Sequence, residues 1–400
     1  MARRLPSELE VRERGNLTMQ PLDTILKRLA QVDARPNAVV SLYLDARWND
    51  EQQRERARLT LKRAVADAIQ GLHSFPREVA ESLERDLARA EEHAMSVIKQ
   101  RRDVGFEGIA AFYCEAKGLD MIVLSHATMP TKLHVGPRPE IWPLARFAND
   151  FEIALVAVVE TDETRIFEVA LSGVLAEESV EADVPDRVQR GGWRQLRIQK
   201  HIADHILHHH QQAARELCAR FDGISAGRGR APRVVLGGRE PMLASLERTL
   251  PERVLMRAIR SPKIDPKGST SEVLEQVREI LALAVRRTQS ELIHLAKEAA
   301  AVGRGALGVA PVIQAANAGR LWQLVVDERF QKEGSRCTRC DLLFSQSFAE
   351  SCPACAGSVE AVSLRDELTR RAVLVGADVY AVDDSGELAN CEGVAATLKY

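Results

Sequence analysis

Apolar positions recur along the chain with two periods, one typical of strands and one typical of helices. Short apolar runs at residues 39–44 and 153–159 predict buried strands. Apolar residues three or four positions apart predict amphipathic helices over residues 51–70, 76–101 and 271–301. Strands and helices mixed in this order predict an α/β fold class, built as several α+β units.

Breaks in this pattern divide the chain into three predicted domains. An N-terminal α+β domain is expected over residues 19–148, and a middle domain over residues 149–260. A C-terminal α/β domain follows over residues 268–400, and a cysteine-containing segment, 335–358, is inserted in it. Several domains suit a chain of 400 residues, because single cores rarely grow beyond about 250–300 residues. Residues 1–18 are charged and are expected to form a loose leader.

The middle domain is expected to combine a small sheet with one long helix. Strands are predicted over residues 153–159, 164–169 and 172–178, and the last two are expected to pair. Residues 184–195 form a polar segment, and helical spacing then continues to about Phe221. In the next domain, the pattern Ser-Thr-Ser-Glu at 269–272 is a capping box, with the first serine as N-cap of the following helix.

Composition narrows the class of protein. Hydrophobic residues make up 45% of the chain and charged residues 28%, as in a soluble globular protein. The formal net charge of −2 gives no argument for nucleic-acid binding, which would need a local basic patch. No apolar run approaches the length of a membrane span, and the first residues lack a signal-peptide pattern. A cytoplasmic protein without a membrane partner is therefore expected.

Four of the seven cysteines form two closely spaced pairs. Two residues separate Cys337 from Cys340 and Cys352 from Cys355, and eleven residues lie between the pairs. Each pair can present two thiolates from one tight turn, and four thiolates make the tetrahedral set that Zn²⁺ accepts. Because the protein would supply all four ligands, the sequence predicts a structural Zn²⁺ and no catalytic metal. The alternative is four free thiols.

A local concentration of basic residues precedes the long helix, and no acidic residue occurs from position 187 to position 200. A basic tip suits a phosphate-rich partner. Gly191 and Gly192 allow close backbone approach, and the ring of Trp193 could stack on an unpaired base. The alternative is a solvated loop that its tryptophan anchors to the same domain. The predicted RNA-binding residues are Arg187, Arg190, Trp193, Arg194, Arg197 and Lys200.

The long helix also carries closely spaced histidines. His201, His205 and His208 would share one face with Asp204, and such a face could bind a metal ion. The chain lacks an HExxH pattern at this place, and the sequence identifies no further ligand elsewhere. A polar helix face is the favoured interpretation, and a metal site is the alternative.

Several separated segments together resemble one superfamily. Residues 364–380 and 393–400 look like the final domain of archaeal and eukaryotic class-1 release factors and of Pelota-type rescue factors. The cysteine segment resembles a zinc knuckle of archaeal members, and the middle domain resembles one in which a Gly-Gly-Gln loop precedes a long helix. Residues 40–44 look like the opening strand of the release-factor N-domain. The resemblance starts at about Pro36 and is to the bacterial branch, which includes Balon-type hibernation factors.

This resemblance implies which residues would reach the ribosome. In release factors, two glycines and a glutamine enter the peptidyl-transferase centre, where the glutamine helps to position water on the peptidyl-tRNA ester. Gly191 and Gly192 match those glycines, and Gln195 is the nearest match to the glutamine. These three are the candidate catalytic residues. Trp193 and Arg194 intervene, however, and would displace the Gln195 amide by several ångströms in an extended loop.

Three functional hypotheses remain open. The family's stop-codon motif, Asn-Ile-Lys-Ser, is absent from residues 50–105, which favours a codon-independent factor that occupies the ribosomal A site for rescue or hibernation. The second hypothesis is an active peptidyl-tRNA hydrolase of the release-factor type. The third is a zinc-containing RNA-binding protein that does not act on ribosomes. The ribosome and its rRNA are the expected partners, and peptidyl-tRNA and a translational GTPase that delivers the factor are further candidates.

Overall fold

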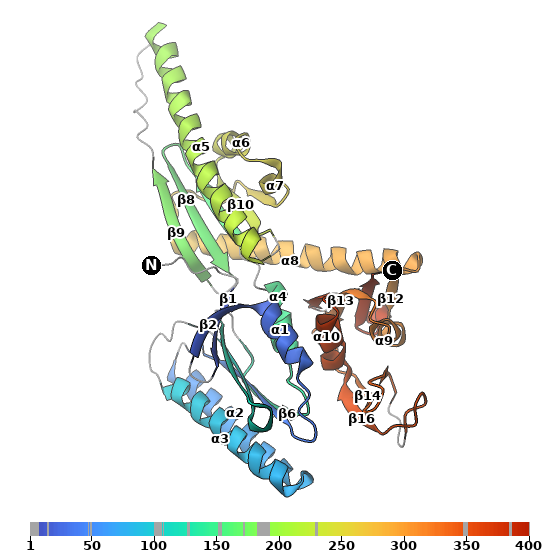
Figure 1. The fold of residues 1–400 in the computed structure, drawn as a ribbon. Helices are drawn as coiled ribbons and strands as arrows, with labels where there is room; N and C mark the ends of the chain where they lie inside the picture. Colours follow the sequence, from blue (N-terminus) through green and yellow to red (C-terminus); the bar gives the residue numbers. More distant parts are fainter. Residues whose placement is uncertain are drawn as a thin grey trace. The chain divides into compact units, whose positions relative to one another are not determined.

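The structure is a computed structural model that divides the chain into two compact units. Unit 1 comprises Phe151–Ala284 with the first eight residues, and unit 2 comprises Leu9–Asp150 and Val285–Tyr400 (Figure 1). The three domain boundaries expected from the sequence stay a prediction. The described residues are 8–13, 16–46, 48, 50–99, 106, 108–125, 129–150, 154–170, 173–181, 193–228, 231–346, 351–383 and 386–399.

Unit 1 is built on a five-stranded mixed sheet with the order β11-β10-β7-β8-β9. Its central strand β7 pairs parallel with β10 and antiparallel with β8. The expected pairing of the second and third strands is confirmed, because β8 and β9 form an antiparallel hairpin. The strands are β7 (Ala154–Val159), β8 (Glu163–Ala170), β9 (Gly173–Glu181), β10 (Arg233–Gly238) and β11 (Ala258–Ser261).

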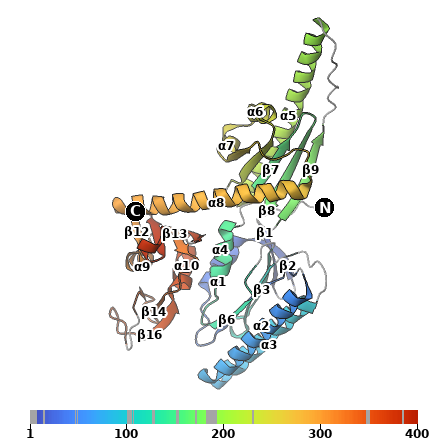
Figure 2. The same ribbon diagram turned by 180° about the vertical axis from the view of Figure 1, so that it is seen from behind.

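Helices cover both faces of this sheet, which explains why all six residues of β7 are apolar and buried. Leu155 and Ala157 pack with α5 and α6, whereas Val156 and Val158 pack with the start of α8. Figures 1 and 2 show α5 and α8 on opposite faces. The helices of unit 1 are α5 (Trp193–Arg228), α6 (Glu240–Glu247), α7 (Glu252–Leu255) and the first part of α8 (Thr270–Ala301).

The predicted capping box at the start of α8 is confirmed. The Ser269 backbone N–H donates to Glu272 Oε2 at 2.8 Å, and the Glu272 N–H donates to Ser269 Oγ at 3.4 Å. These bonds satisfy backbone donors that a helix start leaves free.

The N-terminal half of unit 2 is a six-stranded sheet with the order β2-β1-β5-β4-β3-β6. Helices α2 and α3 pack on one face, against alternate residues of β3 and β4 such as Leu42 and Ala111. Figure 1 shows α1 and α4 on the other side of the sheet. Its elements are β1 (Glu8–Glu13), β2 (Asn16–Pro21), α1 (Leu22–Gln31), β3 (Val39–Asp45), α2 (Glu51–Gly71), α3 (Arg77–Lys99), β4 (Gly108–Cys114), β5 (Leu119–Ser125), β6 (Lys132–Gly136) and α4 (Trp142–Asp150), with short 3-10 turns η1 (Leu72–Ser74) and η2 (Glu115–Lys117).

The expected loose leader is wrong for the residues from Glu8 onward. Strand β1 pairs antiparallel with β5, and Leu9 and Val11 are buried while charged residues alternate with them. This two-residue period is the signal of a half-buried strand. This alternation was missed in the sequence because most residues of the segment are charged.

The C-terminal half of unit 2 holds a four-stranded sheet, β12-β18-β13-β17, and a three-stranded ribbon, β15-β14-β16. The ribbon carries the four paired cysteines and is inserted between β13 and α10, as the sequence predicts. The elements are β12 (Gly305–Leu307), α9 (Val309–Asn317), β13 (Leu321–Asp327), β14 (Glu333–Cys337), β15 (Leu343–Phe344), β16 (Val359–Ser363), α10 (Leu364–Leu374), β17 (Asp378–Val382), η3 (Ala389–Cys391) and β18 (Val394–Leu398).

Helix α8 is continuous and contributes to both units. Val273 and Val277 belong to the core of unit 1, whereas Ile293 and Ala296 belong to the core of unit 2. Within the described part of the chain, no helix is both long and apolar enough to span a membrane.

Candidate functional site

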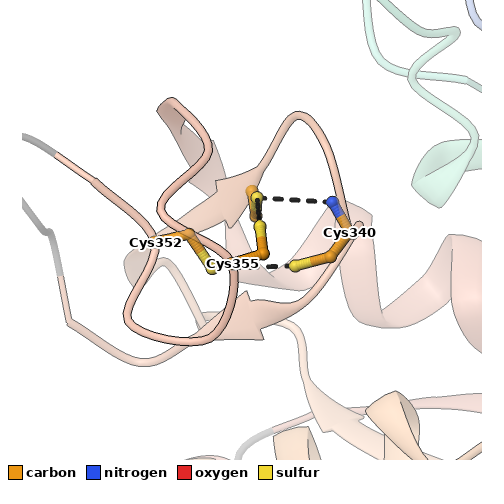
Figure 3. Close-up of side chains that lie close together, drawn as sticks. Cys340, Cys352 and Cys355 are labelled. Atoms are coloured by element: carbon orange, nitrogen blue, oxygen red, sulfur yellow. Dashed lines mark hydrogen bonds between the residues drawn. The ribbon is translucent and has the colours of Figure 1, made fainter.

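The four paired cysteines converge at the turns of the ribbon (Figure 3). Their sulfur atoms all lie within 4.8 Å of one another, with Cys337 Sγ 3.4 Å from Cys355 Sγ and Cys340 Sγ 3.6 Å from Cys352 Sγ. Four sulfurs about 2.3 Å from one tetrahedral centre would lie about 3.8 Å apart. The predicted cysteine set is therefore brought together with the spacing that a tetrahedral metal ion requires.

Backbone groups hold the sulfurs in place. The N–H groups of Cys340 and Arg339 donate to Cys337 Sγ at 3.4 and 3.3 Å. These bonds, with that of Cys340 first, lower the pKa of the Cys337 thiol to about 6. Asp341 and Ala356, each one position after a cysteine pair, both have left-handed backbone conformations, with φ of 58° and 54°. The two turns thus have similar geometry and direct their thiolates toward one point.

Gly357 is a part of this site that sequence reasoning missed. A Cβ atom there would lie 3.2 Å from Cys337 Sγ and 3.3 Å from Cys355 Sγ. It would also lie 2.8 Å from the Cβ atom of Arg339, closer than such atoms approach. The sequence did contain a sign of this role. Gly357 closely follows the second cysteine pair, and a glycine at such a place often permits close backbone packing.

The chemistry of these donors fits Zn²⁺. Cys337 and Cys352 are buried and Cys355 is half-buried, so the four sulfurs form a set only partly open to water. Four thiolates supplied by the protein fill a tetrahedral shell and leave no position for a substrate. A metal ion held by these four thiolates would cross-link the two turns of the ribbon. It would have no open position at which to activate water for hydrolysis.

The basic segment is described only from Trp193 onward. Arg187, Arg190, Gly191 and Gly192 lie outside the described residues. Helix α5 begins at Trp193, so Arg194 and Gln195 lie in its first turn, and not in a loop as the sequence suggested. Arg197 and Lys200 continue the same helix, and no acidic residue occurs in the first turn.

The described side chains of α5 begin at Asp204, and their buried face begins at His209. His209 and His210 are the first buried residues among the described side chains of this helix, and Ala213, Leu217 and Phe221 continue the buried face. Between positions 204 and 208, the side chains are exposed or half-buried. Figure 1 shows the first turns of α5 extending past the end of the β8–β9 hairpin.

The two buried histidines are hydrogen-bonded inside unit 1. His209 Nε2 lies 3.0 Å from Thr164 Oγ1, and His210 Nδ1 lies 2.8 Å from Ser245 Oγ. Burial lowers the pKa of both imidazoles, which favours their neutral forms. These contacts fix the helix to β8 and α6.

The histidine face considered as a metal site gains no support. Asp204 and His208 are exposed, and the side chain of His201 lies outside the described residues. Among the described side chains, the cysteine cluster is the one group whose ligand atoms lie close enough to hold a metal ion.

The segment that contains α5 and the sheet of unit 1 matches a known family. Residues 139–282 match the family model described as "Bacterial archaeo-eukaryotic release factor family 10". The match spans residues 139–282 of a chain of 400 residues, so it describes this segment and not the whole chain. For this segment, the match is to a bacterial family of the archaeo-eukaryotic release-factor type, as the resemblance implied.

Three solved structures, of a termination factor, a Pelota and a release-factor domain, are similar to the chain at low identity. The archaeal translation termination factor aRF1 is 15% identical, with a TM-score of 0.25, over 95% of this chain and 97% of that chain. Pelota of Archaeoglobus fulgidus is 16% identical, with a TM-score of 0.33, over 71% and 73%. The C-terminal domain of a Methanosarcina mazei peptide chain release factor is 23% identical, with a TM-score of 0.26, over 32% and 92%. No curated protein matches the chain.

Proposed function

We propose that this protein is a ribosome-binding translation factor that enters the A site without reading a codon. In this proposal the segment Gly191–Gln195, at the start of α5, reaches toward the peptidyl-transferase centre. The family match supports the release-factor class, and its 139–282 range contains this segment. Rescue of stalled ribosomes and hibernation are both compatible with such a factor.

The observation that carries the proposal is the length of α5 between its start and its first described buried residue. Sixteen residues separate the helix start at Trp193 from His209, the first buried residue among the described side chains of the helix. At ~1.5 Å per residue, the helix start lies ~24 Å along the helix axis from His209. A thin helical projection with a basic end suits entry into a narrow, RNA-lined space.

The start of α5 carries positive side chains, whereas negative side chains are the ones that stabilise the start of a helix. The N-terminal end of a helix carries a partial positive charge, so Arg194 in the first turn is unfavourable by roughly 0.3–1 kcal/mol. A phosphate group at this end would reverse that sign, because it attracts both the arginine and the free backbone N–H groups. The arrangement favours an anionic partner over a solvated surface.

Peptidyl-tRNA hydrolysis is the second candidate function. Gln195 lies in the first helical turn, where backbone N–H groups have no intrahelical acceptor. The backbone N–H of Gln195 could therefore donate a hydrogen bond to a reacting group. The release reaction nevertheless depends on placement to within about an ångström. Occupancy without hydrolysis is the primary proposal for that reason.

We assign a structural Zn²⁺ to the cysteine cluster, held by Cys337, Cys340, Cys352 and Cys355. The bound ion would supply a rigid cross-link between the two turns. Delivery by a translational GTPase, contact with peptidyl-tRNA and a cytoplasmic site of action complete the proposal.

The test uses ribosomes that carry labelled peptidyl-tRNA and an open A site programmed with different codons. We expect the wild-type protein to bind with the same affinity on every codon and to release no peptide. Replacing Arg194 and Arg197 by alanine should weaken binding and reduce the slope of log affinity against log salt by about 1 for each phosphate that is no longer neutralised. A matched control removes Arg215 and Arg248, which are exposed in the body of unit 1.

Each hypothesis has its own outcome in this experiment. Peptide release that Gln195→Ala and Gly192→Ala both abolish would establish the hydrolase. Equal weakening by the arginine pair and by the control pair would contradict a role for the α5 start. Binding to free RNA but not to ribosomes would favour the third hypothesis, a zinc-containing RNA-binding protein without a ribosomal role.

A further inference from the structure

A cluster of charged side chains, in which four of the five arginines are at most 12% exposed, joins the cysteine ribbon to the N-terminal half of unit 2. Its members come from the loops before β3 and α4, from strands β14 and β16, from the turn after β14 that contains Asp341, and from helix α10. Five arginines face four carboxylates in this arginine cluster. Its members are Arg35, Arg138, Arg336, Arg370, Arg371, Asp33, Asp341, Glu360 and Glu367.

Arg138 connects the two halves of unit 2 directly. Its Nη2 atom lies 3.0 Å from Asp33 Oδ2, in the N-terminal half, and 3.2 Å from Asp341 Oδ1, in the ribbon. Its Nη1 atom lies 3.0 Å from Glu367 Oε1 on α10. The side chain is only 12% exposed. Separating the halves would therefore leave buried charges without partners, which is strongly unfavourable.

Asp341 is the carboxylate with the most arginine partners. Besides Arg138, it has Arg370 Nη2 at 3.1 Å, Arg371 Nη2 at 3.4 Å and Arg336 Nη1 at 3.7 Å. Without the Asp341 charge, the cluster would hold five arginines and three carboxylates. The arginines around it would then repel one another at short range in a poorly solvated place.

The position of Asp341 depends on the cysteine turn. It directly follows Cys340 and adopts a left-handed backbone conformation, and its N–H donates to Cys337 O at 3.1 Å. At the other end of the turn, Arg336 precedes Cys337. Its side chain is fully buried, lies 3.2 Å from Glu367 and contacts Glu360. The Cys337–Cys340 turn is thus bracketed by two members of the arginine cluster.

We propose that metal binding at the cysteine cluster controls how firmly the N-terminal half of unit 2 docks on its C-terminal half. The bound ion fixes the Cys337–Cys340 turn and so places Asp341 among the arginines. When the ion leaves, the turn loosens, Asp341 withdraws, and the arginines are left without their shared carboxylate. This inference rests on the proposed Zn²⁺ and is independent of the proposed ribosomal role.

Other interactions between the two halves limit the size of the effect. Arg146 pairs with Glu328 at 2.7 Å, and the Arg365 guanidinium lies 5.2 Å from the ring centroid of buried Trp142. Helices α1 and α4 also contact α10. Loss of the ion should therefore loosen the docking without unfolding either half.

The experiment is amide hydrogen exchange on the full chain, with and without a chelator, and with the zinc content measured separately. Helix α1 contacts α10 but is far from the cysteines in sequence, so it reports docking and not ribbon folding. We expect α1 to exchange about tenfold faster after removal of the metal. The variant Asp341→Asn should show the same increase while it retains the metal, because asparagine tolerates the left-handed conformation but lacks the charge.

Asp222→Asn is the matched control, since it removes the charge of an exposed carboxylate that pairs with Arg253 in unit 1. It should leave α1 exchange unchanged. Faster exchange confined to the ribbon, residues 333–363, on chelation would overturn the proposal. So would an Asp341→Asn variant that exchanges like the wild type, or a purified chain that contains no metal. Ribosome binding by a metal-free chain would leave the functional proposal standing while this one fails.

Discussion

At the scale of single residues, Gly357 has the most exacting surroundings in the cysteine cluster. The methyl group of Gly357→Ala would press on two thiolates and on the Cβ atom of Arg339. Overpacking of this kind typically costs about 1–3 kcal/mol. We expect the variant to hold zinc roughly tenfold to a hundredfold more weakly, measured by competition with a chromogenic chelator.

Gly223→Ala provides the comparison. Gly223 lies within α5, and a Cβ atom there would have no neighbour within 4 Å. This variant should keep wild-type zinc affinity and slightly increase helix stability. Equal zinc affinity in Gly357→Ala and the wild type would show that the turns can move apart more freely than their packing indicates.

At the scale of elements, α5 combines a basic start with an anchored second half. The anchor includes two buried histidines, one bonded to β8 and one to α6. These contacts hold the second half of α5 on the body of unit 1. The same histidines make the attachment sensitive to pH.

The pH dependence has a defined sign. The folded pKa values of His209 and His210 lie below the unfolded value of about 6.5, so the unfolded chain binds more protons in acid. The free energy of unfolding of unit 1 should therefore be constant above about pH 7 and fall as the pH drops below about 6.5. The slope should be at most about 1.4 kcal/mol per pH unit for each histidine.

Denaturant unfolding at about pH 7.5 and about pH 5.5, on either side of the unperturbed histidine pKa, measures this slope. His209→Gln keeps a polar group for Thr164 but cannot be protonated, so it should reduce the decrease in stability at low pH. The exposed residue His73, in unit 2, supplies the control variant His73→Gln. Identical slopes for His209→Gln and the wild type would rule out this histidine as the source.

At the scale of the whole molecule, two cores share one helix. The first part of α8 is buried against the sheet of unit 1, and its last turns are buried in unit 2. Each unit nevertheless has its own sheets and its own apolar core residues, one sheet in unit 1 and three in unit 2 among the described residues. We infer that each unit unfolds as a separate cooperative transition.

Calorimetry with and without a chelator tests this inference. The proposed zinc binds folded unit 2 only, so its removal should lower the transition temperature of unit 2 by several degrees and leave that of unit 1 unchanged. Equal shifts of both transitions, or a single transition under all conditions, would mean that α8 couples the units tightly.

Much of the local structure follows from the sequence alone. The alternation and length of apolar runs predict β7, β8 and β9, and the Ser269–Glu272 pattern predicts the start of α8. The spacing of the cysteines predicts their convergence. In each case the interacting residues are near one another in sequence, so a short stretch of the chain contains all the residues that produce the local structure. The charged strand β1 shows the limit, because its partner β5 lies more than a hundred residues away.

Only the tertiary structure decides which distant charges meet. Arg138 and Glu367 are 229 positions apart, and neither stands out in its own segment. Their pairing, and the place of Asp341 among four arginines, depend on how β14, α10 and the loop before α4 pack. Local spacing in the sequence predicts most of the elements, the cysteine set and the basic segment around Trp193, but not strand β1 or the start of α5. The burial of Arg336, the anchoring of α5 by His209 and the continuity of α8 through two cores required the fold, because burial is a property of all surrounding segments together.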